Sequence, residues 1–173
     1  MMPKVKIKVG DDAPTFKLES YNAGTIDLNQ LIGSQKIVLI FSRYFGCPIC
    51  QLDLETLLQQ VSEIEKMGAK VLYITQSGEK IAKKFIEEKN ITFPVIPSSK
   101  DELYAQYGLG RFSAAAAAKV LTKGKQAKKA GYEHGEYEGY EMQCPGQFVI
   151  DTNGKIIHAK MDWLDIPEIL EVL

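Results

Sequence analysis

Three cysteines are the residues of this sequence that offer the most reactive chemistry. Cys47 and Cys50 form a C-x-x-C pair within RYFGCPIC, and Cys144 follows much later in QCPGQFVID. A thiolate attacks peroxides and disulfides, and it also binds soft metal ions and iron–sulfur clusters. The three cysteines therefore allow peroxide reduction, disulfide exchange, or metal or cluster binding.

The cysteine pair follows a predicted strand and opens a predicted helix. Residues 36–41 (KIVLIF) are an apolar run typical of a central strand buried on both faces, and apolar residues then recur at helical spacing over 54–64. The start of a helix has free backbone N–H groups and the positive end of the helix dipole, which both favour a thiolate. Pro48 suits the first turn, because its missing N–H is not needed there.

This position predicts different roles for the two cysteines. Cys47 would lie at the helix start with a lowered pKa, so we expect it to be the nucleophile. Cys50 lies one turn deeper, should stay protonated to higher pH, and would resolve the first product as a Cys47–Cys50 disulfide. Two buried cysteines without chemistry are one alternative. A metal or iron–sulfur site through Cys47, Cys50 and Cys144 is another, although zinc usually takes four ligands and His134 and His158 are not paired.

The composition is that of an ordinary globular protein. The chain has 173 residues, of which 45% are apolar and 25% charged, with a net charge of −1. We expect a single domain over residues 1–173. The small net charge gives no reason to expect nucleic-acid or membrane binding. The apolar run Ile37–Phe41 is too short to span a bilayer and the first residues contain no apolar signal region, so we expect a cytoplasmic protein.

The remaining pattern predicts an α/β fold. Strand–helix–strand units imply parallel strands with right-handed crossovers, and Asn153-Gly154 predicts a closing antiparallel hairpin. The predicted strands are 4–8, 16–19, 36–41, 71–75, 93–97, 147–151 and 155–159. The predicted helices are a short one capped by Asp27, one over 54–64 ending before Gly68, one capped by Ser77 and reaching Lys89, one over 100–107, and a last one opened by Pro167.

Residues 111–142 differ from the rest of the chain. Five alanines are followed by lysines and then by an acidic, tyrosine-rich part. Alanine and lysine favour helix, so we expect about three helical turns and then an irregular loop anchored by its aromatic residues. The lysines of 119–129 predict a solvated helix face or, alternatively, a surface for an acidic partner. Residues 111–142 could also be the contact surface of a redox-sensing protein.

Several segments together resemble a known family. A mixed sheet with C-x-x-C between its first central strand and the following helix is similar to the thioredoxin fold. The segments GDDAPTFKL (10–18), VLYIT (71–75), FPVI (93–96), YGL (107–109) and FVIDTNGKI (148–156) are similar in order and spacing to the alkyl hydroperoxide reductase/thiol-specific antioxidant family, the peroxiredoxins. This resemblance covers nearly the whole chain outside 111–142. It implies a thioredoxin-like α/β domain whose mixed central sheet is flanked by helices, with an N-terminal β extension and a helical insert before the last hairpin.

The cysteine motif departs from that of typical peroxiredoxins. In their pattern Pro-x-x-x-Thr-x-x-Cys, the threonine position before Cys47 holds Tyr44 and the proline position holds Ile40. The arginine that typically precedes the last hairpin is replaced by the segment Pro145–Phe148. The chain resembles instead a peroxiredoxin-like subgroup with the pattern Arg-x-x-x-Cys-Pro-x-Cys, here Arg43 to Cys50.

The resemblance implies a thiol peroxidase without a cofactor. Cys47 would attack hydrogen or alkyl peroxides, Cys50 would resolve, and a thioredoxin- or glutaredoxin-like protein would be the reductant. Disulfide exchange without peroxidase activity is the alternative. Arg43 is expected to stabilise the thiolate or a bound peroxide oxygen. The resemblance also allows a homodimer.

The thioredoxin-like fold also implies a role for the segment around Cys144. A cis-proline opens the strand that faces C-x-x-C in this fold, and Pro145 stands where it is expected. Cys144 would then lie beside Cys47. There it would be a buried apolar residue, a partner for a second disulfide, or a third thiolate.

Overall fold

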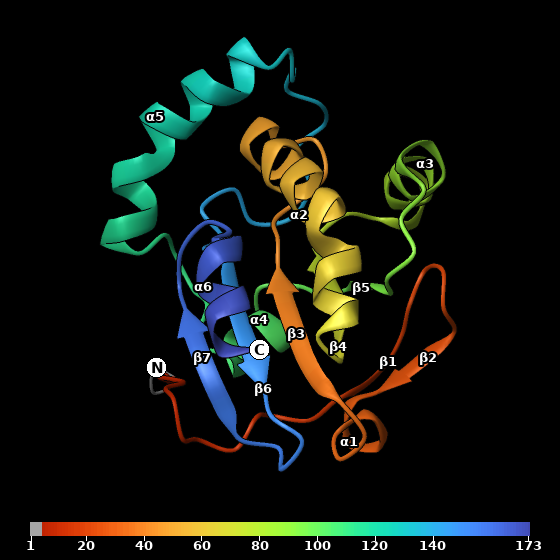
Figure 1. The fold of residues 1–173 in the computed structure, drawn as a ribbon. Coiled ribbons are helices and arrows are strands. Elements are labelled where there is room, and N and C mark those ends of the chain that lie inside the picture. The colour runs from red at the N-terminus through yellow and green to blue at the C-terminus, as the bar shows by residue number, and fades with distance from the viewer. Residues whose placement is uncertain (1–4) are drawn as a thin grey trace.

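The computed structural model describes residues 5–173, which form a five-stranded sheet, a two-stranded sheet and six helices (Figure 1). The strands are β1 (Lys17–Glu19), β2 (Thr25–Asp27), β3 (Lys36–Phe41), β4 (Ala69–Thr75), β5 (Val95–Pro97), β6 (Gly146–Ile150) and β7 (Ile156–Lys160). The helices are α1 (Leu28–Leu31), α2 (Pro48–Lys66), α3 (Glu79–Lys89), α4 (Leu103–Gln106), α5 (Ala114–Lys129) and α6 (Ile166–Val172). This is the mixed α/β architecture that the sequence predicts.

The large sheet has the strand order β5-β4-β3-β6-β7, with β3 at its centre. β3 pairs in parallel with β4, and β4 pairs in parallel with β5. The closing hairpin adds β6 antiparallel to β3 and β7 antiparallel to β6. All β3 residues after Lys36 are buried, which is why this strand is apolar on both faces.

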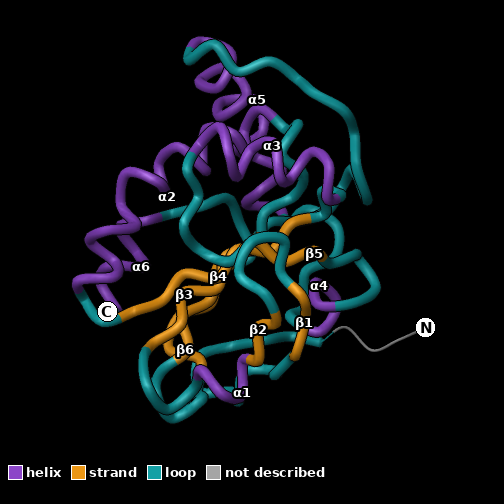
Figure 2. The backbone as a smooth tube through the Cα atoms, turned by 90° about the vertical axis from the view of Figure 1, so that its right-hand side faces the viewer, coloured by secondary structure: helices purple, strands orange, loops and turns teal. Residues whose placement is uncertain are grey.

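Two apolar layers sandwich the large sheet. On one face, α2, α3 and α6 pack against strand residues such as Val38 and Tyr73. On the other face, α1, α4 and the N-terminal segment with β2 cover Leu39 and Phe41. The helix α5 lies outside these layers, beside the start of α2 (Figures 1 and 2). Within residues 5–173, no helix is both long and apolar enough to cross a membrane.

The predicted strand over 4–8 is wrong where it can be compared. Lys4 lies outside the described residues, and residues 5–8 are not a strand. The alternating pattern instead reflects one buried side chain, Ile7, in an extended segment. Gly10 donates its backbone N–H to the carbonyl of Ile156 (2.8 Å), which fixes this segment beside the hairpin. The strand β2 lies where only a turn and a helix start were expected.

Ser77 does not cap α3, contrary to expectation. Gly78 is the N-cap residue, and the Ser77 hydroxyl accepts the backbone N–H of Phe45 (2.8 Å). The Ser77 hydroxyl oxygen is thus engaged in a tertiary hydrogen bond and does not cap α3. This hydrogen bond joins the segment after β4 to the loop that precedes α2.

Candidate functional site

Cys47 and Cys50 lie where β3 leads into α2. Cys47 is the N-cap residue of α2, and its sulfur accepts the backbone N–H of Cys50 (3.3 Å). Pro48 is the first helical residue, as the sequence predicts. Both thiols are buried, with 2% of Cys47 and 4% of Cys50 exposed to solvent. Both sulfur atoms are therefore largely shielded from bulk solvent.

Arg43 is the charged group next to Cys47. Its Nη1 donates a hydrogen bond to the Cys47 sulfur (3.3 Å), and its Nη2 donates to the carbonyl of Glu141. The side chain is itself buried, and its Nε has no hydrogen-bond partner among the described residues. A buried guanidinium with one free donor can bind an oxygen atom that arrives beside the sulfur.

Three aromatic rings hold the Arg43 guanidinium in place. Cation–π contact orients such a group and compensates part of its desolvation. The distances from the guanidinium carbon to the ring centroids are 4.9 Å for Phe112, 5.2 Å for Tyr44 and 5.7 Å for Trp163. In the sequence, Trp163 is compatible with a core or edge aromatic, and Phe112 belongs to no motif. No local pattern could indicate this cage, because its members come from three distant segments.

The two neighbouring thiols have different pKa values. A hydrogen bond from Cys50 and the charge of Arg43 lower the pKa of Cys47 to about 7, although burial opposes this shift. Burial raises the pKa of Cys50 well above its usual range, and the adjacent Cys47 adds to the effect. At neutral pH the site thus contains a nucleophilic thiolate beside a thiol that keeps its proton.

Cys144 lies in the same apolar cluster as the pair. It is buried, its thiol donates to the carbonyl of Pro145 (3.3 Å), and burial raises its pKa. All three cysteines are free thiols. Among residues 5–173, no group of three or more His, Cys, Asp or Glu side chains is arranged to hold a metal ion, so the three-cysteine ligand set has no support.

The cis peptide bond expected before Pro145 is a wrong prediction, because every peptide bond within residues 5–173 is trans. The Cys144 N–H donates to the carbonyl of Gly110 (2.8 Å), and β6 begins two residues later at Gly146. Pro145 nevertheless lies beside Cys50, where both line a small cavity with Trp163.

The second half of the insert lies across the cysteine site. We call residues 131–142 the cover segment. Gly135 donates its N–H to the carbonyl of Gly46 (2.8 Å), directly before Cys47. A Cβ atom on Gly46 would lie 2.5 Å from the carbonyl oxygen of Glu136, so only glycine permits this approach.

Further contacts join the cover segment to the loops around the site. Gln51 donates its side-chain amide to the carbonyl of Glu133 (3.1 Å), and Gly78 donates its N–H to the Glu138 carboxylate (2.8 Å). Together with the Arg43 contact to Glu141, these hydrogen bonds connect the cover segment to the loop after β3, to α2 and to the N-cap of α3. The irregular loop expected here is therefore a structural part of the site.

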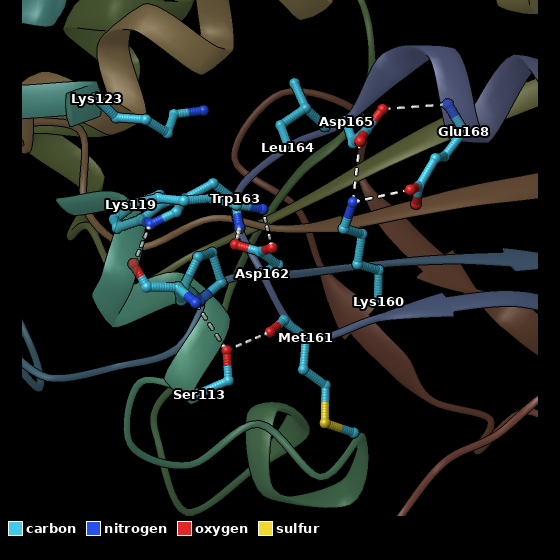
Figure 3. Close-up of polar contacts among 12 residues, drawn as sticks. Ser113, Lys119, Lys123, Lys160, Met161, Asp162, Trp163, Leu164, Asp165 and Glu168 are labelled. Atoms are coloured by element: carbon cyan, nitrogen blue, oxygen red, sulfur yellow. Dashed lines mark hydrogen bonds and ion pairs between the residues drawn. The ribbon is translucent and has the colours of Figure 1, made fainter.

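The helix α5 is longer than the three turns that were expected, and one of its lysines, Lys123, is largely shielded from solvent. Lys123 pairs with Asp53 of α2 (2.6 Å), and Lys119 pairs with Asp162. Figure 3 shows the loop after β7, with Asp162 and Trp163 beside α5. No role for Asp53 is predicted from the sequence. The sequence does contain an indication of one, because Asp53 is an acidic residue one turn after Cys50 on the apolar face of the same helix.

A cavity of about 590 Å³ opens over Cys47, between the start of α2 and the insert. Its wall includes the three rings around Arg43 and six residues of the cover segment, among them His134 and Tyr137. The Tyr44 hydroxyl lies 3.2 Å from His134 Nε2, and burial raises the pKa of Tyr44 to about 12. Tyr44 is thus a neutral hydroxyl at the position where typical peroxiredoxins have threonine.

Comparisons with known proteins agree with this geometry. A model of the AhpC/TSA family matches residues 9–159. The chain is 26% identical over 152 residues to a putative peroxiredoxin bcp of Coxiella burnetii, which covers 88% of this chain and 87% of that protein. It is also 26% identical over 108 residues to the thiol-disulfide oxidoreductase ResA of Oceanobacillus iheyensis. That match covers 60% of this chain and only 55% of the relative.

Solved structures show the same fold. Peroxidoxin BcpB from Mycobacterium tuberculosis matches with a TM-score of 0.67 and 19% identity, over 90% of this chain and 86% of that one. A putative thiol:disulfide interchange protein DsbE from Chlorobium tepidum matches with a TM-score of 0.65 and 21% identity, over 95% and 94% of the two chains. The fold is thus shared by a protein described as a peroxidoxin and by one described as a putative thiol:disulfide interchange protein.

Proposed function

We propose, because the chain belongs to the AhpC/TSA family, that it is a thiol-dependent oxidoreductase that reduces peroxides through Cys47. The observation that carries this proposal is the Arg43–Cys47 contact at the start of α2, which favours a thiolate beside a buried, protonated Cys50. The Nε of Arg43, which has no hydrogen-bond partner among residues 5–173, supports it further, because it is a donor on the same guanidinium and a peroxide supplies oxygen acceptors.

In the first step, the Cys47 thiolate attacks one oxygen of the peroxide. An S–O bond forms and the O–O bond breaks, so Cys47 becomes a sulfenic acid. The leaving oxygen takes up a proton and departs as water or as an alcohol. Arg43 lies where negative charge develops on the oxygens, and its position is fixed in advance by the aromatic rings.

In the second step, the thiol of Cys50 attacks the sulfur of the sulfenic acid. The Cys47–Cys50 disulfide forms, and the departing hydroxyl group leaves as water with the proton of Cys50. A dithiol then reduces the disulfide and restores both thiols. We propose a thioredoxin- or glutaredoxin-like protein as this reductant, and a cytoplasmic location, where cysteines remain free thiols.

Disulfide exchange without peroxidase activity is the second candidate. The similarity to ResA supports it, and so does Tyr44 at the position of the usual threonine. A thiolate at a helix start with a second cysteine one turn deeper suffices for this chemistry, since no peroxide needs to be bound.

Rapid mixing of the reduced protein with hydrogen peroxide or an alkyl hydroperoxide tests the proposal. We expect a second-order rate well above that of free cysteine thiolate, followed by a Cys47–Cys50 disulfide in the mass spectrum. Cys50→Ser should accumulate the sulfenic acid, which dimedone traps. Cys144→Ser should keep turnover. If both peroxides react no faster than they do with free cysteine thiolate, the peroxidase proposal is contradicted and disulfide exchange remains as the candidate function.

A further inference from the structure

The cavity over Cys47 is much larger than hydrogen peroxide requires. Its volume of about 590 Å³ lies within the range of roughly 300–1,000 Å³ that is typical of sites for small organic molecules. The insert supplies a large part of its wall, which includes Phe112, Val120 and Tyr137. The sheet and the helices of the central fold alone would not enclose it.

The wall of the cavity is mainly aromatic and aliphatic. Ile49 and Trp163 contribute from the central fold, and Tyr132 contributes from the cover segment. Apolar walls select apolar ligands, because the free energy gained depends on the apolar area removed from water. The lining residues thus suit a carbon skeleton.

The charged groups of the cavity restrict the ligand further. Arg43 and Lys128 carry positive charges, and Glu133 and Glu141 carry negative charges, so the wall favours neither an anion nor a cation overall. Arg43 is the buried charge: its Nη1 contacts the Cys47 sulfur, and its Nε has no hydrogen-bond partner among residues 5–173. These groups suit a neutral ligand with an apolar body and with oxygen atoms at the end that faces Cys47.

We propose that the insert forms a binding site for the organic part of the substrate, and that the substrate is a neutral hydroperoxide whose apolar body is at least the size of an aromatic ring. This inference rests on the proposed peroxidase function and adds the selection of large organic hydroperoxides over hydrogen peroxide. Each methylene-sized group buried in an apolar pocket contributes about 10-fold or more to selectivity. A ring should therefore be preferred by at least about 10-fold in kcat/KM.

Gly124 allows the cavity to be filled without disturbing the fold. It lies on α5 at the cavity wall, and a Cβ atom added there meets no atom within 4 Å. Gly124→Phe should lower kcat/KM for cumene hydroperoxide at least about 10-fold more than that for hydrogen peroxide. Gly124→Ala is the matched control, because it adds helix propensity but little volume, and it should keep the selectivity of the unaltered protein.

A binding measurement separates this inference from the peroxidase proposal. Trp163 is the sole tryptophan of the sequence and lines the cavity, so its fluorescence reports occupancy. Titration with 2-phenyl-2-propanol, the unreactive alcohol product, should give a saturable change that Gly124→Phe abolishes and Gly124→Ala retains. If no peroxide is consumed but this binding pattern is found, the peroxidase proposal fails and the cavity proposal stands.

Two results would overturn the cavity proposal. One is the absence of saturable binding to the unaltered protein. The other is an equal effect of Gly124→Phe on both peroxides, or no effect on either. If circular dichroism shows that Gly124→Phe loses helix, Tyr137→Ala replaces it, because this exposed ring can be removed without unfolding the core. This second variant should lower kcat/KM for cumene hydroperoxide selectively, and an unchanged ratio would contradict the proposal.

Discussion

At the residue scale, the reactivity of Cys47 depends on two donors and on the burial that opposes them. The Cys50 thiol and the Arg43 guanidinium both favour the thiolate, and they outweigh the desolvation of the sulfur. Arg43 can do this because its own charge is compensated by aromatic rings rather than by a carboxylate. A carboxylate partner would have cancelled its effect on the sulfur.

Removal of the Arg43 charge should raise the pKa of Cys47. Alkylation of Cys47 by iodoacetamide, followed by mass spectrometry at that site, should rise with pH to a midpoint of about 7, because only the thiolate reacts. In Arg43→Met the midpoint should move upward, so the rate at neutral pH should fall. The other arginine, Arg111, is exposed, and Arg111→Met should leave the profile unchanged. An unshifted midpoint in Arg43→Met would contradict the role given to Arg43.

At the element scale, α5 is held on the central fold by an ion pair that is largely shielded from water. The side chains of Lys123 and Asp53 are 18% and 16% exposed, and Asp53 also accepts the N–H of Leu164 (3.2 Å). The N-cap residue Ser113 anchors the other end, because its hydroxyl donates to the carbonyl of Met161 (2.6 Å) (Figure 3). These contacts place the insert firmly enough to form one wall of the cavity.

Loss of Lys123 should destabilise the protein in a pH-dependent way. Burial raises the pKa of Asp53, and Lys123 opposes that shift. Lys123→Met leaves a buried carboxylate without its partner, which should lower the free energy of unfolding by about 1–3 kcal/mol. A raised folded-state pKa means that stability falls as pH rises from the unfolded to the folded pKa of Asp53. The loss measured by urea unfolding should therefore be larger at neutral pH than in mild acid.

Two further variants check that assignment. Lys125 is exposed two residues further along α5, and Lys125→Met should cost little stability. Adding Asp53→Asn to Lys123→Met removes the uncompensated charge, so the pH dependence should disappear. An equal loss of stability from both lysine variants at every pH would show that the ion pair does not hold α5.

At the scale of the whole molecule, the insert and the central fold share one set of contacts around the cysteines. The indole N–H of Trp163 donates to the carbonyl of Ala116 in α5 (2.9 Å), while the Trp163 ring packs in the cysteine cluster. We therefore propose that residues 1–173 unfold as a single domain, with the insert as part of it.

A comparison of two probes during urea unfolding tests this proposal. Trp163 fluorescence reports the junction between insert and central fold, and far-ultraviolet circular dichroism reports all helices. The two curves should coincide in one cooperative transition, as is usual for single domains of this size. A fluorescence change at lower urea concentration would show that the insert detaches before the rest unfolds.

Local patterns determined much of this protein. The bounds of β3, the start of α2 at Pro48 and the closing hairpin follow from apolar runs, helix-start chemistry and turn residues that lie next to one another in the chain. The choice of Cys47 as the candidate nucleophile follows from the same local reasoning, because a cysteine at a helix start is expected to have a lowered pKa.

Only the tertiary structure decided what surrounds the thiolate. The cage around Arg43, the approach of Gly135 to Gly46 and the ion pair between Lys123 and Asp53 each join segments that are far apart in the sequence, so no periodicity or motif indicates them. The local Cys-Pro pattern likewise does not indicate the trans bond before Pro145 or the hydrogen bond from the Cys144 N–H to Gly110. RYFGCPIC by itself indicated a reactive thiol, and the folded insert formed the cavity through which that thiol is reached.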